Sequence, residues 1–301
     1  KKHKENQVLE NLKKMPKTTL PEHYPIIGSE ETTYYRNKLE FTFSDMRWLT
    51  AEEIDSGKEF SREALGFHIP GRFDKILDIQ KCWLQPDPSN EIRTTVKDYA
   101  LANGLTFFNL RDQHGLLRNL IIRTTTTGEV MIIVQFFEPD QKSIEGLMAH
   151  LKEKFPSITS LLYIVNEKKN ETYHDQEVIT YHGKDFITEK MGELMFRIGP
   201  KSFYQTNPVQ AEKLYQVALD FADLQGHELV YDLYCGTGTI SNYIASKAKK
   251  VVGIEYVEEA VTDAKVNSEL NKITNTAFYA GDMKDLLSAE FIQQRGTPDV
   301  F

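Results

Sequence analysis

The sequence has few cysteines and no long apolar run. These two features argue against a disulfide-stabilised protein and against a membrane-spanning one. Its two cysteines, Cys82 and Cys235, are too few for a disulfide framework, so we expect a reducing, cytoplasmic compartment. No apolar stretch reaches the roughly 18 residues that a membrane span requires. No secretory signal is visible in these residues. We therefore expect no membrane partner.

A surplus of positive charge is also lacking. The net charge is −8, from 36 Lys and Arg against 44 Asp and Glu. This balance excludes a uniformly basic nucleic-acid binder, although it leaves room for a local basic face. The chain is 40% apolar and 27% charged, as in globular proteins, and its 301 residues suffice for two domains. The composition alone gives no oligomeric state.

The most informative stretch alternates apolar runs with amphipathic segments of helical spacing. The runs 229–234, 251–254 and 276–280 have the length of buried strands. They end in the glycine turn Cys235-Gly236-Thr237-Gly238, in Glu255 and in Gly281-Asp282. This order predicts a doubly wound α/β sheet, whose ligand would lie at the carboxyl ends of the strands.

The acid after the second run suggests a ribose as part of that ligand. A carboxylate accepts hydrogen bonds from both ribose hydroxyls, and Glu255 follows the glycine turn by about the expected 20 residues. Ser241 stands where a dinucleotide cradle would have its third glycine, which disfavours NAD. The alternative is an α/β domain that binds no nucleotide and whose acidic residues only cap helices. A ligand is favoured because all three strand ends carry residues of the kind that a nucleotide site uses.

Two motifs carry a family resemblance. D-x-x-C-G-x-G followed by an acid and then G-D resembles the class I S-adenosylmethionine methyltransferases. Upstream, FRIGPKSFYQTNPVQAEKLY at 196–215 contains S-F-[FY]-Q-x-N and Q-A-E-x-L-Y, which resemble the RumA/TrmA family of RNA uracil-C5 methyltransferases. The firm part of the match is 196–282. It implies a Rossmann-like methyltransferase domain, incomplete at its C-terminus, after an α+β middle domain.

The resemblance also implies where S-adenosylmethionine binds. It places the methionine end at Asp232 and the glycine turn, the ribose at Glu255 and the adenine amino group at Asp282. Thr239 departs from the asparagine often found at its position, and Gln205 has helix initiation as an alternative role. The full set of implied cofactor contacts is Gln205, Asp232, Tyr234, Gly236, Gly238, Thr239, Glu255 and Asp282.

The resemblance assigns no catalytic residue to this chain. In the family a cysteine thiolate adds to C6 of uracil, C5 takes the methyl group, and a glutamate removes the C5 proton. Both residues, and a D-P-P-R loop, would lie beyond residue 301. Cys235 is an alternative nucleophile, because a helix N-terminus favours a thiolate. Its place on the cofactor side instead favours packing. We expect the chain to bind the cofactor but not to transfer methyl groups.

Composition and spacing divide the chain into three parts. Residues 1–22 are an N-terminal helical segment, 23–198 a middle α+β domain, and 199–301 the partial cofactor domain. Thr297 to Phe301 resemble the opening of a fourth strand, so we expect a fragment. In the middle domain we expect strands at 34–43, 121–123, 130–136 and 160–165, helices at 89–102 and 143–155, and a hairpin around Thr124–Gly128.

Two basic residues and one cysteine of the middle domain are candidate sites. Arg36 and Lys38 would contact phosphates or splayed bases of RNA, or else belong to a solvated strand face. Cys82 in DIQKCWLQ matches, by the resemblance, the last of four ligands to a [4Fe-4S] cluster in the full-length protein. A buried structural cysteine is the alternative. The cysteine favours ribosomal RNA, specifically 23S, over transfer RNA.

Other classes stay open on the sequence alone. One is a class I methyltransferase acting on another substrate, which a downstream D-P-P-R loop and cysteine motif would exclude. Another is an RNA-binding module that has kept the cofactor fold and lost catalysis. An NAD-dependent oxidoreductase fits least. His174 and His182 have no partners at metal-site spacing and are predicted to be solvated loop residues.

Overall fold

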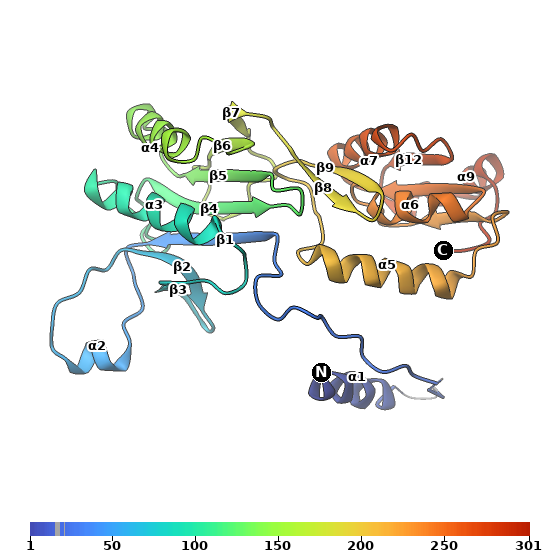
Figure 1. Cartoon of the computed structure of the whole chain (residues 1–301), viewed down its shortest axis with the longest axis horizontal. Coiled ribbons are helices and arrows are strands. Elements are labelled where there is room, and N and C mark those ends of the chain that lie inside the picture. Colours follow the sequence, from blue (N-terminus) through green and yellow to red (C-terminus); the bar gives the residue numbers. More distant parts are fainter. Residues whose placement is uncertain (16–18, 21) are drawn as a thin grey trace.

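The computed structural model describes residues 1–15, 19–20 and 22–301. Two α/β lobes lie side by side along the long axis of the molecule, as Figure 1 shows. The strands are β1 (Lys38–Ser44), β2 (Ala64–Ile69), β3 (Arg72–Asp78), β4 (Leu117–Thr124), β5 (Val130–Phe136), β6 (Ser160–Val165), β7 (Ile179–Gly183), β8 (Ile187–Met191), β9 (Leu194–Ile198), β10 (Leu229–Asp232), β11 (Lys250–Glu255) and β12 (Thr276–Ala280).

Helices α3 and α4 lie where the sequence predicts helices, at 89–102 and close to 143–155. None of the helices in the described ranges is long and apolar enough to cross a membrane. They are α1 (Lys2–Lys13), α2 (Ala51–Asp55), α3 (Ser89–Ala102), α4 (Gln141–Lys154), α5 (Pro208–Ala222), α6 (Thr239–Ile244), α7 (Glu258–Leu270), α8 (Met283–Leu286) and α9 (Ala289–Arg295).

The first lobe is built on a seven-stranded sheet in the order β3-β2-β1-β4-β5-β6-β7. Strands β5 and β6 are parallel, and the other neighbours are antiparallel. Helices α3 and α4 cover one face (Figure 1), where Ile92 and Leu147 pack against Leu120 and Ile132. Side chains alternate between the faces of a strand, so Ile121 packs on the opposite face, beside the β8–β9 hairpin.

The strand predicted at 34–43 begins later than its aromatic pattern suggests. Tyr34 has a φ of 54°, in the left-handed region that β-branched and aromatic residues seldom adopt, and the ladder with β4 starts at Lys38. The residues before it pair elsewhere, because the Tyr34 and Arg36 amides donate to the carbonyls of Trp83 and Leu84 at 2.7 and 2.8 Å.

The second lobe contains the predicted doubly wound arrangement. Strands β10, β11 and β12 are parallel and adjacent in that order. On the free side of β10, Val300 forms a parallel bridge to Val230, as expected for the run at the end of the sequence. Parallel strands joined through helices place all their carboxyl ends at one edge, and this edge carries the candidate site.

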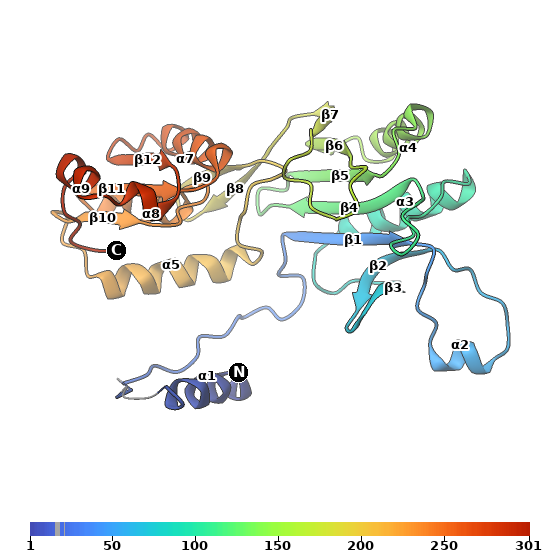
Figure 2. The ribbon, with the colours of Figure 1, turned by 180° about the vertical axis from the view of Figure 1, so that it is seen from behind.

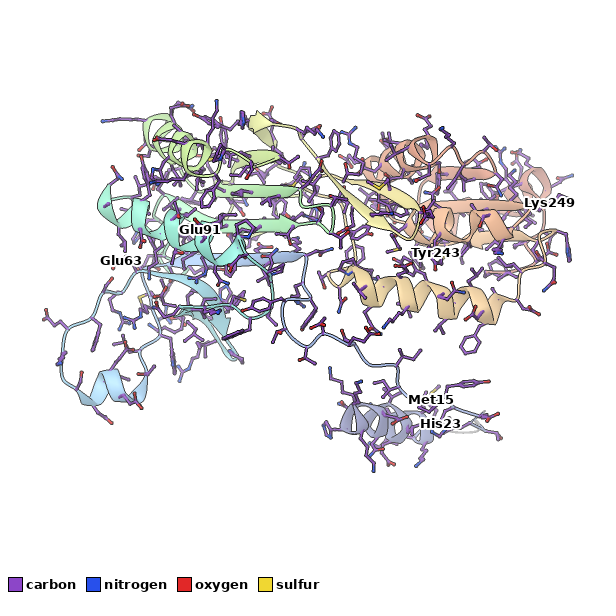
Figure 3. All side chains as sticks on the ribbon, viewed as in Figure 1. Met15, His23, Glu63, Glu91, Tyr243 and Lys249 are labelled. Carbon is purple, nitrogen blue, oxygen red and sulfur yellow. The ribbon has the colours of Figure 1, made fainter. Side chains whose placement is uncertain are left out.

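Helix α5 runs along the second lobe. The Asn207 side chain accepts a hydrogen bond from the Gln210 amide at 3.0 Å, and Pro208 occupies the first turn, where its missing N–H is not needed. Tyr243 of α6 lies between α6 and α5 (Figure 3), with its hydroxyl 3.1 Å from Gln216 Oε1 and its ring 5.8 Å from that of Tyr215.

The β8–β9 hairpin joins the two lobes. Its Arg197 and Met195 amides donate to the side chains of Asn267 and Asn271 on α7, at 2.7 and 2.8 Å. The predicted hairpin after β4 contacts it from the other lobe, where the Thr126 amide donates to Glu189 at 2.9 Å. Strand β9 ends at Ile198, next to the predicted domain boundary, and the hairpin itself packs on both lobes. The division into domains stays a prediction.

Helix α1 stands apart from both lobes in the two opposite views of Figures 1 and 2. None of its residues is buried. A hydrogen bond of 3.2 Å from the Ile26 amide to Glu5 Oε1 links it to the following segment. The helix predicted for the N-terminal segment is therefore present, but it contributes nothing to either core.

Candidate functional site

The glycine turn joins β10 to α6 and opens main chain to a ligand. Gly238 precedes the helix with a φ of 75°, and a Cβ there would lie 2.9 Å from the Cβ of Ala264. Gly236 also has a positive φ, of 52°, but a Cβ there would meet no atom within 4 Å. Gly238 is thus required by packing, whereas Gly236 faces open space at the end of the sheet.

Glu255 ties the second strand end to the glycine turn. Its Oε2 accepts from the Gly236 amide at 3.1 Å, and its Oε1 accepts from the Val257 amide at 3.0 Å. The Glu255 carbonyl accepts from the Gly281 amide at 2.9 Å, which brings the third strand end alongside. A carboxylate offers about four acceptor positions, so both oxygens keep capacity for a ligand.

Asp232 is the second acid at this edge and is partly buried. Its Oδ2 accepts from the Ser241 hydroxyl at 2.7 Å. Burial raises the pKa of Asp232, the hydrogen bond from Ser241 opposes that rise, and the nearby Glu255 carboxylate adds a smaller increase. Two acids around one turn favour a cationic ligand. The sequence analysis did not identify Ser241 as the hydrogen-bond partner of Asp232. It used Ser241 only as the residue that replaces the third glycine of a dinucleotide motif.

Cys235 packs into the lobe rather than facing the ligand. Its side chain is 5% exposed and belongs to a cluster with Val261, Ala264 and Phe278. Burial raises the pKa of the Cys235 thiol, and the charges of Asp232 and Glu255 raise it further. The thiol therefore stays protonated, and the packing role weighed for it in the sequence fits better than a nucleophilic one.

Three further predicted cofactor residues surround the same edge in different ways. Tyr234 is 77% exposed at the start of the turn. Thr239 is the first residue of α6, and its hydroxyl lies 3.4 Å from that of Tyr215. Asp282 is the N-cap residue that precedes α8 and accepts from the Lys284 amide at 2.9 Å. This capping role leaves its second oxygen for a ligand.

Gln205 lies on another side of the junction. It lines a groove of about 370 Å³ together with Ile27 and the first turns of α5. Its carbonyl accepts from the Asn37 side chain at 3.1 Å, and the Asn37 amide donates to the Thr206 carbonyl at 2.8 Å. The structure therefore gives the S-F-Y-Q-T-N segment contact with the first lobe, while the cofactor role of Gln205 stays a prediction.

A cavity of about 610 Å³ opens between the lobes beside Glu255. One wall comes from the second lobe, where the Ser202 hydroxyl donates to Asp263 Oδ2 at 2.7 Å. The other comes from the segment after β6. Residues lining it from both sides include His174, Glu177, Lys201, Phe203, Gly236 and Glu255. Its volume is in the range typical of small-molecule sites, and no local spacing in the sequence brings these segments together.

The loop after β6 is held by a buried arginine. Arg118 is 1% exposed and donates to the carbonyls of Asn166, Lys168 and Asn170 at 2.9, 2.6 and 2.7 Å. Its guanidinium also lies 4.7 Å from the centre of the Phe108 ring. Because this loop continues to His174 and Glu177, Arg118 positions one wall of the cavity from within the first lobe.

A histidine–carboxylate pair tethers the same loop, and its strength should depend on pH. His68 Nε2 lies 3.7 Å from Glu171 Oε1, and Nδ1 lies 2.8 Å from the Phe73 carbonyl. Glu171 raises the pKa of His68 above its ordinary 6.5, aided by Phe73 and, more weakly, by Glu40. In turn His68 lowers the pKa of Glu171 below its ordinary 4.5, with a smaller contribution from Arg118.

The pair should therefore stabilise the fold most between pH 4.5 and 6.5. A raised histidine pKa contributes stability below its unfolded value and loses it as pH rises through the folded value. The lowered glutamate pKa contributes above its unfolded value and is lost in acid. Urea unfolding across pH should show this maximum in the native chain and a flatter profile in His68→Gln. His23→Gln, at the exposed residue labelled in Figure 3, is the control, and an unchanged profile in His68→Gln would contradict the role.

The candidate RNA residues and Cys82 lie in the first lobe. Lys38 is half-buried, and its pKa is lowered by burial and by the charge of Arg123. Arg36 is partly exposed beside the 83–84 segment. Cys82 is 4% exposed, and its amide donates to Asn90 Oδ1 at 2.7 Å. Across the described ranges, no three His, Cys, Asp or Glu side chains form a metal-ligand group.

Comparison with known proteins gives relatives along the whole chain. A model of the methyltransferase domain matches residues 225–296. An uncharacterized RNA methyltransferase of Bacteroides thetaiotaomicron is 55% identical over 99% of this chain and 66% of its own length. One of Porphyromonas gingivalis is also 55% identical, over 99% and 65%. The chain thus spans just under two thirds of these relatives.

A solved structure shares the fold of both lobes. It is the Pyrococcus abyssi tRNA (uracil-54, C5)-methyltransferase in complex with S-adenosyl-L-homocysteine, which is 25% identical in sequence, with a TM-score of 0.65. The match covers 84% of this chain and 56% of that one. The predicted class of fold, a Rossmann-like methyltransferase lobe beside an α+β lobe, is confirmed by this likeness and by the domain match.

Proposed function

Because this chain belongs to the RNA methyltransferase family of its bacterial relatives, we propose that it forms the cofactor-binding and RNA-contacting part of an enzyme that methylates C5 of a uridine in RNA. The observation that carries the proposal is the position of Glu255. Its carboxylate accepts from the Gly236 and Val257 amides, and all three residues line the cavity between the lobes. In this proposal Glu255 binds the nucleoside of the cofactor beside the cavity that both lobes line.

The residues at the strand ends fit S-adenosylmethionine. Its sulfonium and ammonium groups are cationic, and Asp232 and Glu255 place two carboxyl groups at this edge of the sheet. The open main chain at Gly236 leaves room for its methionine end. Glu255 would hold the ribose hydroxyls, and Asp282 would accept from the adenine amino group. When bound, the cofactor supplies an electrophilic methyl group; the side chains of this chain bind and orient it.

Two observations favour uracil C5 as the atom that accepts the methyl group. One is the S-F-Y-Q-T-N and Q-A-E-K-L-Y segment at 202–215, which resembles the uracil-C5 family. The other is the likeness of both lobes to a uracil-54 C5 enzyme. As substrate we place 23S ribosomal RNA before transfer RNA because of the cysteine at position 82, and a tRNA-directed enzyme is the alternative.

The proposed route is covalent and needs a thiolate. The thiolate adds to C6, C5 takes the methyl group, a base removes the C5 proton, and elimination from C6 releases the thiolate. Neither thiol of this chain suits that step, because Cys82 is buried in the first lobe and Cys235 has a raised pKa. The proposal therefore places the nucleophile outside these 301 residues and makes the chain a binder that does not transfer methyl groups alone.

Tritium release tests this proposal at the level of the reacting atom. Ribosomal RNA transcribed with [5-³H]uridine loses tritium to water only when C5 is substituted. We expect release that depends on S-adenosylmethionine with the protein of the full reading frame and none with the 301-residue chain. Methylation without tritium release would exclude C5. RNA binding without methylation by the full-length protein would favour a non-catalytic RNA-binding module.

A further inference from the structure

An exposed tryptophan lies on a rigid loop of the first lobe, away from the cavity. Trp83 is 55% exposed, and the neighbouring Tyr34 is 37% exposed with its ring centre 5.7 Å away at 44°. Lys81 places its ammonium 4.1 Å from the centre of the Trp83 ring. Large aromatic side chains normally gain stability by burial, so two neighbouring exposed rings are a candidate binding surface.

Buried groups fix the loop that carries Trp83. Arg93, 1% exposed, donates to the carbonyls of Ile79 and Gln80 at 2.5 and 2.9 Å. Asn90 holds Cys82 from both sides, accepting from its amide at 2.7 Å and donating to its carbonyl at 3.1 Å. The tryptophan is therefore presented by a preorganised backbone, which lowers the entropic cost of using it for binding.

We propose that Trp83 and Tyr34 form a stacking platform for an unpaired nucleotide of RNA, with Lys81 and Arg36 contacting its phosphates. The choice of RNA as partner rests on the proposed function. Single-stranded RNA is typically recognised by exposed aromatic rings flanked by cations. A purely apolar protein partner would not use the charges that border this pair.

The cation now over the ring does not prevent stacking. A solvent-exposed cation–π contact is worth about two- to fivefold in an equilibrium constant, whereas stacking one base on an aromatic side chain is worth about five- to 150-fold. A base should therefore displace the Lys81 ammonium, which is then free to pair with a phosphate. The flexible stem of lysine allows that movement while the backbone stays in place.

The platform lies on a path to the junction between the lobes. Tyr34 and Arg36 pair with the 83–84 segment through their amides, and the next residue, Asn37, contacts Gln205 and Thr206 of the second lobe. An RNA strand held at Trp83 would thus extend toward the segment that begins the cofactor lobe. The platform would hold a nucleotide flanking the target rather than the target base.

Fluorescence of a single tryptophan tests the platform in the 301-residue chain. The chain has two tryptophans, so Trp48→Phe leaves Trp83 as the reporter. Oligouridylate should quench its emission, and the same strand annealed to oligoadenylate should do so more weakly. Trp83→Ala should weaken oligouridylate binding about fivefold or more, with Trp83→Phe retaining most of the affinity. Phe73→Ala, which removes a ring that is 66% exposed on the same lobe, is the matched control.

Two results would overturn the platform. One is unquenched Trp83 emission at oligouridylate concentrations that saturate the chain; the other is native affinity in a Trp83→Ala variant with an unchanged melting temperature. Titration of Trp83→Ala with S-adenosylmethionine separates this inference from the proposed function. Unchanged cofactor binding with weakened RNA binding supports both. Quenching by RNA in a chain that does not bind the cofactor would support the platform and contradict the methyltransferase proposal.

Discussion

Replacing Glu255 by alanine should weaken S-adenosylmethionine binding by about tenfold or more. The variant loses the acceptors proposed for the ribose hydroxyls, and hydrogen bonds to charged groups contribute about 1.5–3 kcal/mol each. It also releases the Gly236 and Val257 amides, which the two carboxylate oxygens hold at 3.1 and 3.0 Å. Both losses act on the site, so calorimetric titration should show a higher dissociation constant.

Glu269→Ala is the matched control for this titration. Glu269 is an exposed acid near the end of α7, so the change in charge is the same and the strand ends are untouched. We expect its affinity to equal that of the native chain. Native affinity in a folded Glu255→Ala variant would contradict the ribose role, and an equal loss in both variants would indicate a general electrostatic effect instead.

Replacing Arg118 by leucine should lower the free energy of unfolding by about 3 kcal/mol. Three carbonyls of the 166–170 segment, of which that of Asn166 is buried, lose a charged donor at 2.6–2.9 Å. Leucine restores apolar volume but donates no hydrogen bond, so the carbonyls must find water or stay unsatisfied. Urea unfolding monitored by circular dichroism measures the change.

Arg72→Leu provides the comparison for Arg118. Arg72 is exposed at the start of β3, so the same chemical change there should alter the free energy of unfolding by no more than about 0.5 kcal/mol. Similar values for the two variants would mean that the loop is not held by the buried guanidinium. A selective loss for Arg118→Leu would show that the cavity wall depends on a residue of β4.

The residues at the strand ends of the second lobe could be predicted because each of them directly follows its strand in the sequence. Each apolar run is followed directly by its glycine or acid, and parallel connections bring such ends to one edge. Glu255 and Gly236 are separated by only 19 positions, and a hydrogen bond of 3.1 Å joins them in the structure, while their shared ligand stays a prediction. In the first lobe, local patterns predicted four of the seven sheet strands, at 34–43, 121–123, 130–136 and 160–165, and both covering helices.

The junction between the lobes was not predictable, because its partners lie far apart in the chain. Asn37 contacts Gln205 across 168 positions, and Arg118 holds carbonyls about 50 positions away. No periodicity reports such pairs, which tertiary packing alone brings together. The sequence marked Cys82 as a candidate cluster ligand, but no motif or spacing marked its neighbour Trp83. The structure shows that Cys82 is buried and that Trp83 is exposed to solvent.

The most direct test of the account is the native titration itself. The central claim is that the edge formed by Asp232, Gly236 and Glu255 binds S-adenosylmethionine. Calorimetry of the 301-residue chain should give saturable binding of S-adenosylmethionine and of S-adenosylhomocysteine, without competition by NAD. Saturable binding of NAD with no response to S-adenosylmethionine would contradict the claim and assign this edge of the sheet to a different nucleotide.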